Sequence, residues 1–128
     1  MTVGVTYDTG ALIAADRNDR SIWALHAGYL GEGVIPVVPT PVVAEAWRGG
    51  SRQASLARFL ASCEIEELSL EQAMNVGVLA GTAKFDDVVD VTVVEGAIRR
   101  RDVVVTSNPT HIRAIANAVP ARLVVETV

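Results

Sequence analysis

Short runs of β-branched residues alternate with helix-forming segments along the chain. Each run has roughly the length of a typical strand, and the segments between them carry Ala, Leu and other helix formers. The predicted strands are 3–7, 34–38, 64–68, 103–106 and 122–126, and the predicted helices are 9–16, 20–30, 41–47, 52–62, 70–80, 86–100 and 109–118. This alternation predicts an α/β fold, a three-layer α/β/α sandwich with a mostly parallel central sheet.

Capping residues mark several of the predicted helix ends. Thr40 is expected to be the N-cap of one helix, with Pro41 at its first helical position. Ser69 and Gln72 have the spacing of a capping box at the start of another helix. Pro36 is poorly suited to the predicted strand in which it lies, because it has no backbone N–H to donate to a neighbouring strand.

The size and composition of the chain predict one folded domain, residues 1–128. Half of the 128 residues are hydrophobic and a fifth are charged, which is enough apolar surface for a core and excludes a disordered chain. The single cysteine, Cys63, excludes an internal disulfide and a thiolate zinc site. The two histidines exclude a metal centre built from several imidazoles. These features are typical of a protein from a reducing compartment, and we expect a cytoplasmic location.

No segment of the sequence is expected to interact with a membrane. The first residues lack the basic and apolar regions of a secretory signal, and no apolar run reaches the roughly 18–20 residues needed to span a bilayer. The formal charge of −4 argues against non-specific coating of nucleic acid. It leaves a nuclease possible, since an acidic metal site adds negative charge until a cation binds.

Four polar residues stand out because of where they lie: Asp8, Glu45, Asp90 and Asn108. The three acids border stretches of Val and Ala, and a carboxylate is costly to desolvate there unless it has a partner. Asp8 and Asn108 follow predicted strands, at the sheet edge where α/β proteins bind ligands. A hard divalent cation, Mg2+ or Mn2+, is the simplest shared partner for converging carboxylates.

Each of these four residues also has a purely structural interpretation. Asp8 and Asn108 could serve only as helix N-caps, and Asn108 precedes a proline that suits the first helical turn. Glu45 could form a buried ion pair with an arginine. Asp90 is expected on the core-facing stripe of its helix, near the helix start, where backbone N–H groups favour an anion. The sequence alone leaves these interpretations open.

Other charged residues near the same helix are interpreted as solvent-exposed. Thr92, Glu95 and Arg99 are expected to form its solvent face, and Arg99 to Arg101 to be solvated side chains that complement the helix dipole. Asp86 is expected to be solvated, whereas Asp87 is equally compatible with a role in the site. Cys63 is interpreted as a core residue, and the two tryptophans as core or interface residues.

Taken together, these segments resemble the PIN-domain ribonucleases, specifically the VapC toxins of type II toxin–antitoxin pairs. The resemblance rests on Asp8-Thr9 after the first strand, on a helix with a single Glu45, on the segment Asp87-Val-Val-Asp90-Val, and on the strand end before Asn108-Pro109. It extends over essentially the whole chain. Each motif is weak alone, and their order and spacing make the set fairly specific.

The resemblance implies a metal site and a chemistry. Asp8, Glu45 and Asp90 would bind one or two Mg2+ or Mn2+ ions, and Asn108 takes the fourth position, where many members carry Asp. That exchange removes one negative charge. Thr9 and Ser107 match small hydroxyl positions that could support the site. The expected reaction is metal-assisted hydrolysis of RNA phosphodiester bonds, with Glu45 orienting or deprotonating the attacking water.

The resemblance also implies partners. The expected substrate is structured RNA such as tRNA, and the expected protein partners are a cognate VapB-like antitoxin and a second copy of the chain. An amphipathic antitoxin tail would bind a groove, which we expect near Trp23, Leu30 and Trp47.

Two other classes of protein were weighed against this one. A PIN-like binding module with weak or no nuclease activity is the stronger alternative, and Asn108 supports it. A phosphoacceptor receiver domain fits poorly, because Asp8 is followed by Thr9 and the only lysine, Lys84, precedes a helix. Nucleotide-binding glycine motifs are absent from the sequence.

Overall fold

The computed structural model describes residues 3–128, and a single parallel sheet forms the centre of this fold. Its strands are β1 (Val5–Tyr7), β2 (Val37–Pro39), β3 (Glu64–Glu66), β4 (Val103–Thr106) and β5 (Val124–Thr127). Their order is β3-β2-β1-β4-β5, and every pairing is parallel. The predicted α/β class is therefore confirmed. The chain leaves β1 for β2 on one side and returns to pair β4 on the other, so a topological switch point lies beside β1.

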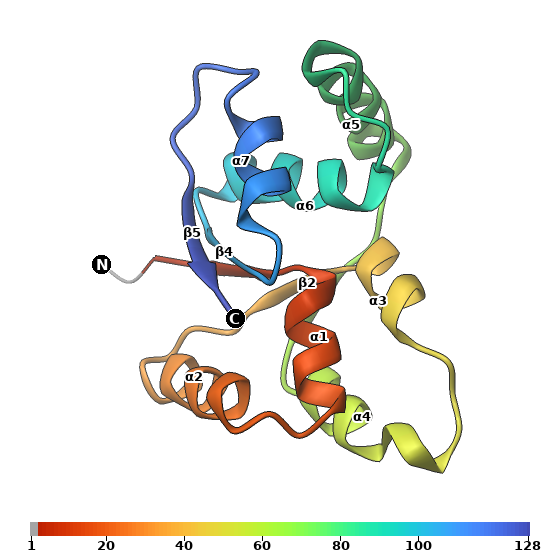
Figure 1. Cartoon of the computed structure of the whole chain (residues 1–128), viewed down its shortest axis with the longest axis vertical. Coiled ribbons are helices and arrows are strands. Elements are labelled where there is room, and N and C mark those ends of the chain that lie inside the picture. The colour runs from red at the N-terminus through yellow and green to blue at the C-terminus, as the bar shows by residue number, and fades with distance from the viewer. Residues whose placement is uncertain (1–2) are drawn as a thin grey trace.

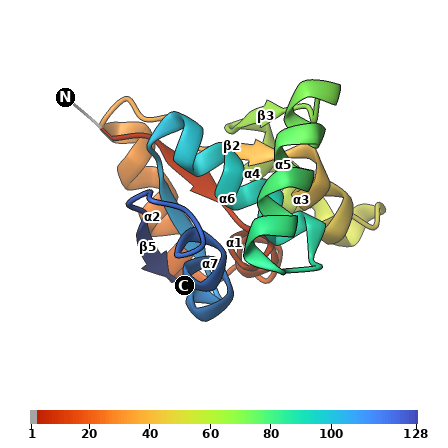
Figure 2. The ribbon, with the colours of Figure 1, turned by 90° about the horizontal axis from the view of Figure 1, so that it is seen from above.

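Helices cover both faces of this sheet, as a three-layer sandwich requires. One face carries α1 (Thr9–Asp16), α2 (Arg20–Gly31) and α4 (Ala54–Ala61), and the other carries α5 (Leu70–Ala83), α6 (Val88–Arg100) and α7 (Pro109–Ala116) (Figure 1, and from above in Figure 2). The short helix α3 (Thr40–Ala46) contacts both α1 and α6, and the 3-10 helix η1 (Ser51–Gln53) leads into α4. Within residues 3–128 no helix has the length and apolar character needed to cross a membrane.

Buried polar groups on the α2 and α4 side form one continuous hydrogen-bond chain. Ser62 Oγ donates to the Phe59 carbonyl oxygen at 2.9 Å and lies 2.6 Å from His26 Nε2. Because that hydroxyl proton is used, Nε2 carries the imidazole proton, and Nδ1 accepts from the Tyr7 hydroxyl at 2.8 Å. Burial lowers the pKa of His26, so the ring is neutral, and stacked Tyr7 and Phe59 complete the packing. Cys63 is half-buried beside them, and burial raises the pKa of its thiol to about 12.

Several predicted boundaries were wrong by a few residues for local reasons. Pro39, rather than Thr40, is the N-cap of α3, and Thr40 Oγ1 instead accepts from the Leu68 N–H at 3.3 Å. Strand β2 begins after Pro36, which has no N–H for the ladder. Ser69 caps α5 as predicted and accepts from the Gln72 N–H at 3.1 Å. The ends of other elements shift in the same way, and α6 begins at Val88.

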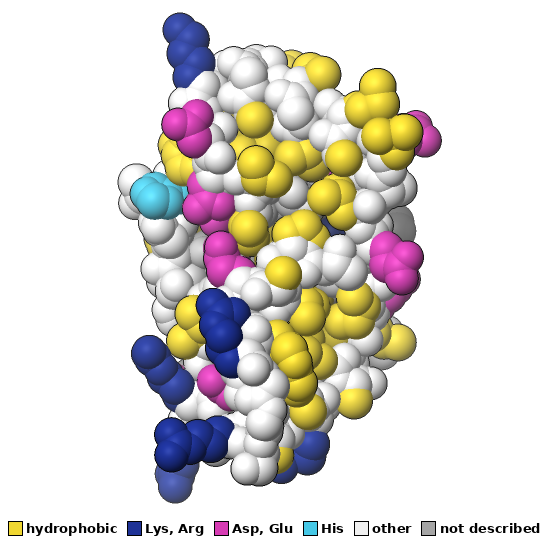
Figure 3. All heavy atoms as spheres, turned by 90° about the vertical axis from the view of Figure 1, so that its right-hand side faces the viewer, with side chains coloured by type: hydrophobic (Ala, Val, Ile, Leu, Met, Phe, Trp, Pro, Cys, Tyr) yellow, Lys and Arg dark blue, Asp and Glu magenta, His cyan; other side chains and the backbone are white. Residues whose placement is uncertain are grey.

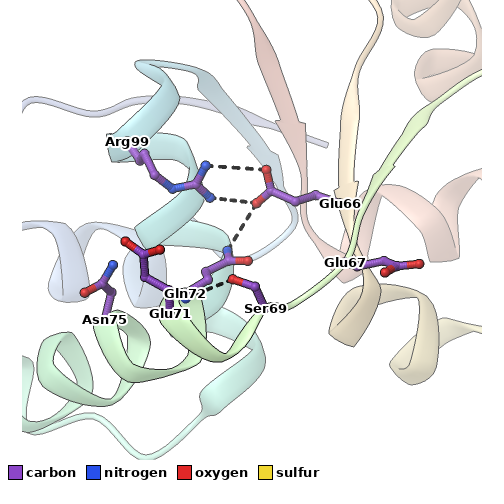
Figure 4. Close-up of a pocket in the computed structure, with 7 residues that line it drawn as sticks. All are labelled: Glu66, Glu67, Ser69, Glu71, Gln72, Asn75 and Arg99. Atoms are coloured by element: carbon purple, nitrogen blue, oxygen red, sulfur yellow. Dashed lines mark hydrogen bonds and ion pairs between the residues drawn. The ribbon is translucent and has the colours of Figure 1, made fainter.

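The prediction that Arg99 to Arg101 are solvated is confirmed for exposed Arg99 and Arg101 and wrong for Arg100, and both Arg99 and Arg100 form ion pairs. Arg99 Nη2 lies 2.7 Å from Glu66 Oε1 and Arg99 Nε lies 3.2 Å from a Glu95 oxygen, as Figure 4 shows for Glu66. Arg100 Nη1 lies 2.7 Å from the other Glu66 oxygen, and its Nε lies 2.9 Å from Asp102 Oδ2. The arginines connect α6 to strand β3, a distant contact that a local sequence pattern does not reveal. Arg101 is exposed.

The predicted solvent face of α6 is wrong for Thr92 and Glu95, whereas Arg99 is exposed as predicted. Thr92 has no exposed surface, and its hydroxyl donates to the Val88 carbonyl oxygen at 2.7 Å. Helix α5 packs over this side of α6, and the Gln72 amide nitrogen Nε2 donates to Glu95 at 3.0 Å and to Glu66 at 3.2 Å. Thr92 and Glu95 therefore lie at the contact between two helices and do not face solvent.

Asp102 is the most buried carboxylate of the arginine network. Its carboxylate is buried, and it accepts hydrogen bonds from Arg100 Nε at 2.9 Å and from the Thr6 hydroxyl at 2.7 Å. We expect Asp102→Asn to lower the free energy of unfolding by about 2–3 kcal/mol, because it leaves part of the Arg100 charge unpaired. Urea unfolding would measure this, with Asp86→Asn at an exposed acid as the matched control. Equal stability of the two variants would contradict the assignment.

Candidate functional site

A cavity of about 280 Å3 lies beside the switch point, at the carboxyl ends of β1 and β4. All four residues singled out in the sequence line it, together with six others. The lining residues are Asp8, Thr9, Gly10, Ile13, Glu45, Asp87, Asp90, Ser107, Asn108 and His111. They come from the starts of α1, α6 and α7 and from α3, so residues far apart in the sequence meet at one place.

Asp8 is the buried floor of the cavity. Its Oδ2 accepts a hydrogen bond from the Thr106 hydroxyl at 2.7 Å, and its Oδ1 accepts from the Thr9 backbone N–H at 2.7 Å. Burial raises the pKa of Asp8, these two hydrogen bonds lower it, and the negative charges of Glu45 and Asp87 raise it further. Asp8 is also the N-cap of α1. The capping interpretation and the site interpretation therefore describe the same side chain.

The first turn of α1, next to Asp8, packs closely against the segment that follows β4. A Cβ atom on Gly10 would lie 2.6 Å from Ser107 Cβ and 2.8 Å from the Ser107 backbone nitrogen. No side chain at position 10 fits without moving the backbone after β4. The start of α1 is therefore held directly against the segment that leads into α7.

Glu45 reaches the cavity from the opposite side, on α3. Its Oε1 accepts a hydrogen bond from the Thr9 hydroxyl at 2.6 Å, so Thr9 supports this carboxylate as the sequence analysis expected of a small hydroxyl. The suggested buried ion pair with arginine is wrong, because Glu45 is exposed and no arginine in residues 3–128 pairs with it. Glu45 is thus a carboxylate at the rim of the cavity that has no cationic partner among the described residues.

The start of α6 contributes two further carboxylates. Asp87 is the N-cap, and its Oδ1 accepts from the backbone N–H groups of Val89 at 3.1 Å and Asp90 at 3.2 Å. Asp90 is only 14% exposed in its side chain. Its pKa is raised to about 6, first by burial and then by the charges of Asp8 and Asp87, while His111 opposes the shift. Asp86 is exposed and does not line the cavity, as predicted.

The start of α7 brings two side chains to the cavity: Asn108, which the sequence predicted, and His111, which it did not. Asn108 is the N-cap, with its Oδ1 3.5 Å from the His111 backbone N–H. Its amide Nδ2 lies 2.9 Å from His111 Nδ1, and the same ring nitrogen lies 3.5 Å from Asp90 Oδ2. His111 could have been found from its position, because a residue three positions after a helix N-cap faces the same end of the helix.

The charge balance of the cavity is unfavourable in the absence of a cation. Four carboxylates line it, and none of the lining residues in the described chain is Lys or Arg. As they stand, no three His, Cys, Asp or Glu side chains in residues 3–128 are gathered closely enough to hold a metal ion. The donors are nevertheless carboxylate and amide oxygens, which suit Mg2+ or Mn2+. The pKa values of Asp8 and Asp90 are raised first by burial and then by neighbouring carboxylates, whose repulsion a cation would relieve.

A second polar cavity, of about 300 Å3, lies away from these residues, between the end of β3 and the start of α5 (Figure 4). Two of its charged groups satisfy each other, since Arg99 pairs with Glu66, and the Gln72 amide donates to the same carboxylate. We therefore attribute this cavity to the structural network that joins α5 and α6.

Comparison with known proteins identifies the fold. Neither a protein-family model nor a curated protein matches this sequence. The solved structures that are similar include the crystal structure of VapBC2 from Rickettsia felis bound to a DNA fragment from their promoter. The alignment covers 98% of this chain and 98% of that chain, with a TM-score of 0.76 and 19% sequence identity. The chain therefore has a VapC-like PIN fold.

Proposed function

We propose that this protein is a metal-dependent endoribonuclease that acts as the toxin of a type II toxin–antitoxin pair. The observation that carries the proposal is the cavity lined by Asp8, Glu45, Asp87 and Asp90 at the switch point of a PIN fold. Unbalanced carboxylates that raise one another's pKa are costly to a structure and are typical of sites that bind a cation.

Asp8, Glu45 and Asp90 are the proposed ligands for one or two Mg2+ or Mn2+ ions. When bound, such an ion activates water and stabilises charge on the phosphate oxygens during in-line displacement. Exposed Glu45, held by the Thr9 hydroxyl at 2.6 Å, orients or deprotonates the attacking water. Buried Asp8 stays in place through Thr106 and the Thr9 N–H. Hydrolysis by water leaves a 5′-phosphate and a 3′-hydroxyl.

Basic side chains next to the acids support an RNA substrate. Figure 3 shows Lys and Arg side chains below the acidic side chains on the face that contains α3. The segment between α3 and α4 carries exposed Arg48 and Arg52, and Gln53 shapes it by accepting from the N–H groups of Arg48 at 2.6 Å and Gly49 at 2.9 Å. Arginines suit phosphate contacts, and the net charge of −4 confines such contacts to a local patch. Structured RNA such as tRNA is the proposed class.

A second copy of the chain is the proposed partner for the outer face of α5. Leu70, Met74 and Val78 are 78%, 63% and 71% exposed and lie one turn apart on this helix. Hydrophobic side chains also gather on the upper part of the face in Figure 3, where α5 lies. In an antiparallel pair centred on Met74, Leu70 lies opposite the partner's Val78, because each lies four residues from the centre. The apolar stripe is thus self-complementary.

The surface of this chain that we propose for the antitoxin is smaller than the groove expected near Trp23, Leu30 and Trp47. Trp23 is half-buried, and its indole N–H donates to the Ala15 carbonyl oxygen at 3.2 Å while its ring packs edge-on against Phe59. Trp47 is exposed at the end of α3, and exposed Ile13 lies at the lip of the acidic cavity. We propose that an amphipathic antitoxin segment covers Trp47 and Ile13 and so blocks the cavity.

A PIN-like binding module remains the alternative function, and one observation favours it. Asn108 takes the position where the resemblance expects an acid, and its amide group is engaged with His111 at 2.9 Å. In that case the cavity would bind a partner without cleaving RNA.

Cleavage of cellular RNA by the purified protein separates these functions. We expect cleavage with Mg2+ or Mn2+, none with EDTA, and a loss of at least about 100-fold in Asp8→Asn and Asp90→Ala, because each removes a carboxylate that positions the cation. Asp8→Asn keeps the size of the side chain, and circular dichroism would verify the fold. Asp86→Asn, an exposed acid outside the cavity, should retain full activity.

Full cleavage by folded Asp90→Ala would contradict the proposed mechanism. No cleavage by antitoxin-free wild-type protein with any metal would instead favour the binding module. The reversion Asn108→Asp would then test whether the missing carboxylate is the cause.

The raised pKa of Asp90 predicts a measurable pH dependence of stability. Its pKa is about 6 in the folded protein and about 4 in an unfolded chain, so the folded state binds the proton more tightly. Stability from this group is therefore fully present below about pH 4 and is lost as pH rises through 6. In EDTA, Asp90→Asn should exceed wild type by about 2–3 kcal/mol at pH 7.5 and by less than half of that at pH 4.5. Urea unfolding at both pH values would measure this.

A difference between Asp90→Asn and wild type that does not change with pH would contradict that assignment. The same measurement with Mn2+ at pH 7.5 extends it. The ion should stabilise wild type more than the variant, since the variant lacks one of the three proposed carboxylate ligands.

The proposed dimer can be tested by light scattering coupled to size-exclusion chromatography. We expect Met74→Asp to give a monomer, because it buries a charge against its own copy near the two-fold axis. Ile35→Asp replaces an equally exposed apolar residue outside α5 and should keep the wild-type mass. A wild-type monomer, or a Met74→Asp dimer, would contradict the α5 interface.

A further inference from the structure

His111 is the one side chain at the acidic cavity that can offer a nitrogen to a cation, among the residues that line it. It lies one turn after Asn108 on α7, and its Nδ1 is 3.5 Å from Asp90 Oδ2. The ring packs edge-on against Phe85, with ring centroids 5.4 Å apart and an interplanar angle of 69°. This contact holds the exposed imidazole with Nδ1 directed toward the carboxylates.

The hydrogen bonds of Asn108 indicate that Nδ1 carries a lone pair. The Asn108 carbonyl oxygen Oδ1 faces the His111 backbone N–H at 3.5 Å, which leaves the amide nitrogen Nδ2 facing His111 Nδ1 at 2.9 Å. An amide nitrogen can only donate, so the ring nitrogen opposite it accepts. The same lone pair is the one that an imidazole uses to bind a metal, so the Asn108 amide must turn away from the ring when a cation binds.

The distance between Nδ1 and Asp90 is close to that between two ligands of one metal ion. Two ligand atoms at about 2.1 Å from a metal, at an angle of about 90–110°, are about 3.0–3.4 Å apart. The observed separation between Nδ1 and Asp90 Oδ2 is 3.5 Å. Small rotations of either side chain would therefore allow both atoms to reach the same cation.

We infer that His111 Nδ1 is a metal ligand that shares a cation with Asp90, and that the site therefore selects Mn2+ over Mg2+. This inference rests on the proposed function, since it concerns the same cation site. At the fourth position of the site Asn108 has no carboxylate, and His111, one turn later on α7, supplies a neutral nitrogen. Of the two candidate ions, Mn2+ accepts a nitrogen ligand more readily than Mg2+, which is bound by oxygen ligands in near-octahedral geometry.

The competing explanation is an ion pair in which a protonated His111 neutralises Asp90. A protonated ring has no lone pair for a metal, so the two explanations differ in what Mn2+ does to the imidazole. A direct spectroscopic measurement on the bound ion separates them without reference to RNA cleavage.

The experiment is Mn2+ binding to the metal-free protein, followed by electron paramagnetic resonance. Echo-envelope modulation should show nitrogen coupled to Mn2+ in wild type, and this signal should be lost in His111→Ala. The Mn2+ affinity of His111→Ala should fall by about tenfold or more, while its Mg2+ affinity changes little. Thr110→Ala, an exposed neighbour on α7, is the matched control and should behave as wild type.

The outcomes keep this inference distinct from the proposed function. Bound Mn2+ without nitrogen coupling, and with the same affinity in His111→Ala, would overturn the role of His111 and leave the carboxylate site standing. Failure of wild type to bind Mn2+ or Mg2+ at all would overturn both.

Discussion

The hydrogen bond from the Thr106 hydroxyl to Asp8 Oδ2 joins the ends of the two strands on which the site is built. Strand β1 lies between β2 and β4, so its carboxyl end faces the place where the chain changes direction across the sheet. Thr106 also accepts from the Asn108 backbone N–H at 2.9 Å. One hydroxyl thus fixes the floor of the cavity and the start of α7 together.

Three helix starts meet around this bond. Asp8, Asp87 and Asn108 are the N-caps of α1, α6 and α7, and all three line the same cavity. Helix starts carry partial positive charge, which offsets some of the repulsion among the carboxylates and lets the fold keep them close. Capping and binding are therefore two uses of one arrangement, which explains why each residue alone had an adequate structural explanation in the sequence.

The sequence predicted most of what depends on local pattern. The order of strands and helices followed from hydrophobic periodicity and caps, and Asp8, Glu45, Asp90 and Asn108 line one cavity because they follow or face the carboxyl ends of strands. Contacts between distant segments were missed. The pairing of Arg99 and Arg100 with Glu66, and the cover that α5 places over Thr92, depend on tertiary packing. Only the structure reveals which partner such a side chain meets. The roles of the site residues stay predictions.

The contrast between Asp8 and Glu45 has a consequence for how tightly the site can hold anything. Asp8 is buried and has its rotamer fixed by two hydrogen bonds, whereas Glu45 is exposed and has one. The conformational entropy of Asp8 is lost when the chain folds, whereas Glu45 keeps more of its freedom until something binds. Affinity at this cavity therefore depends on a carboxylate of α3 that the fold restrains less than Asp8, and a partner that fixed the Glu45 side chain would change affinity without touching the floor.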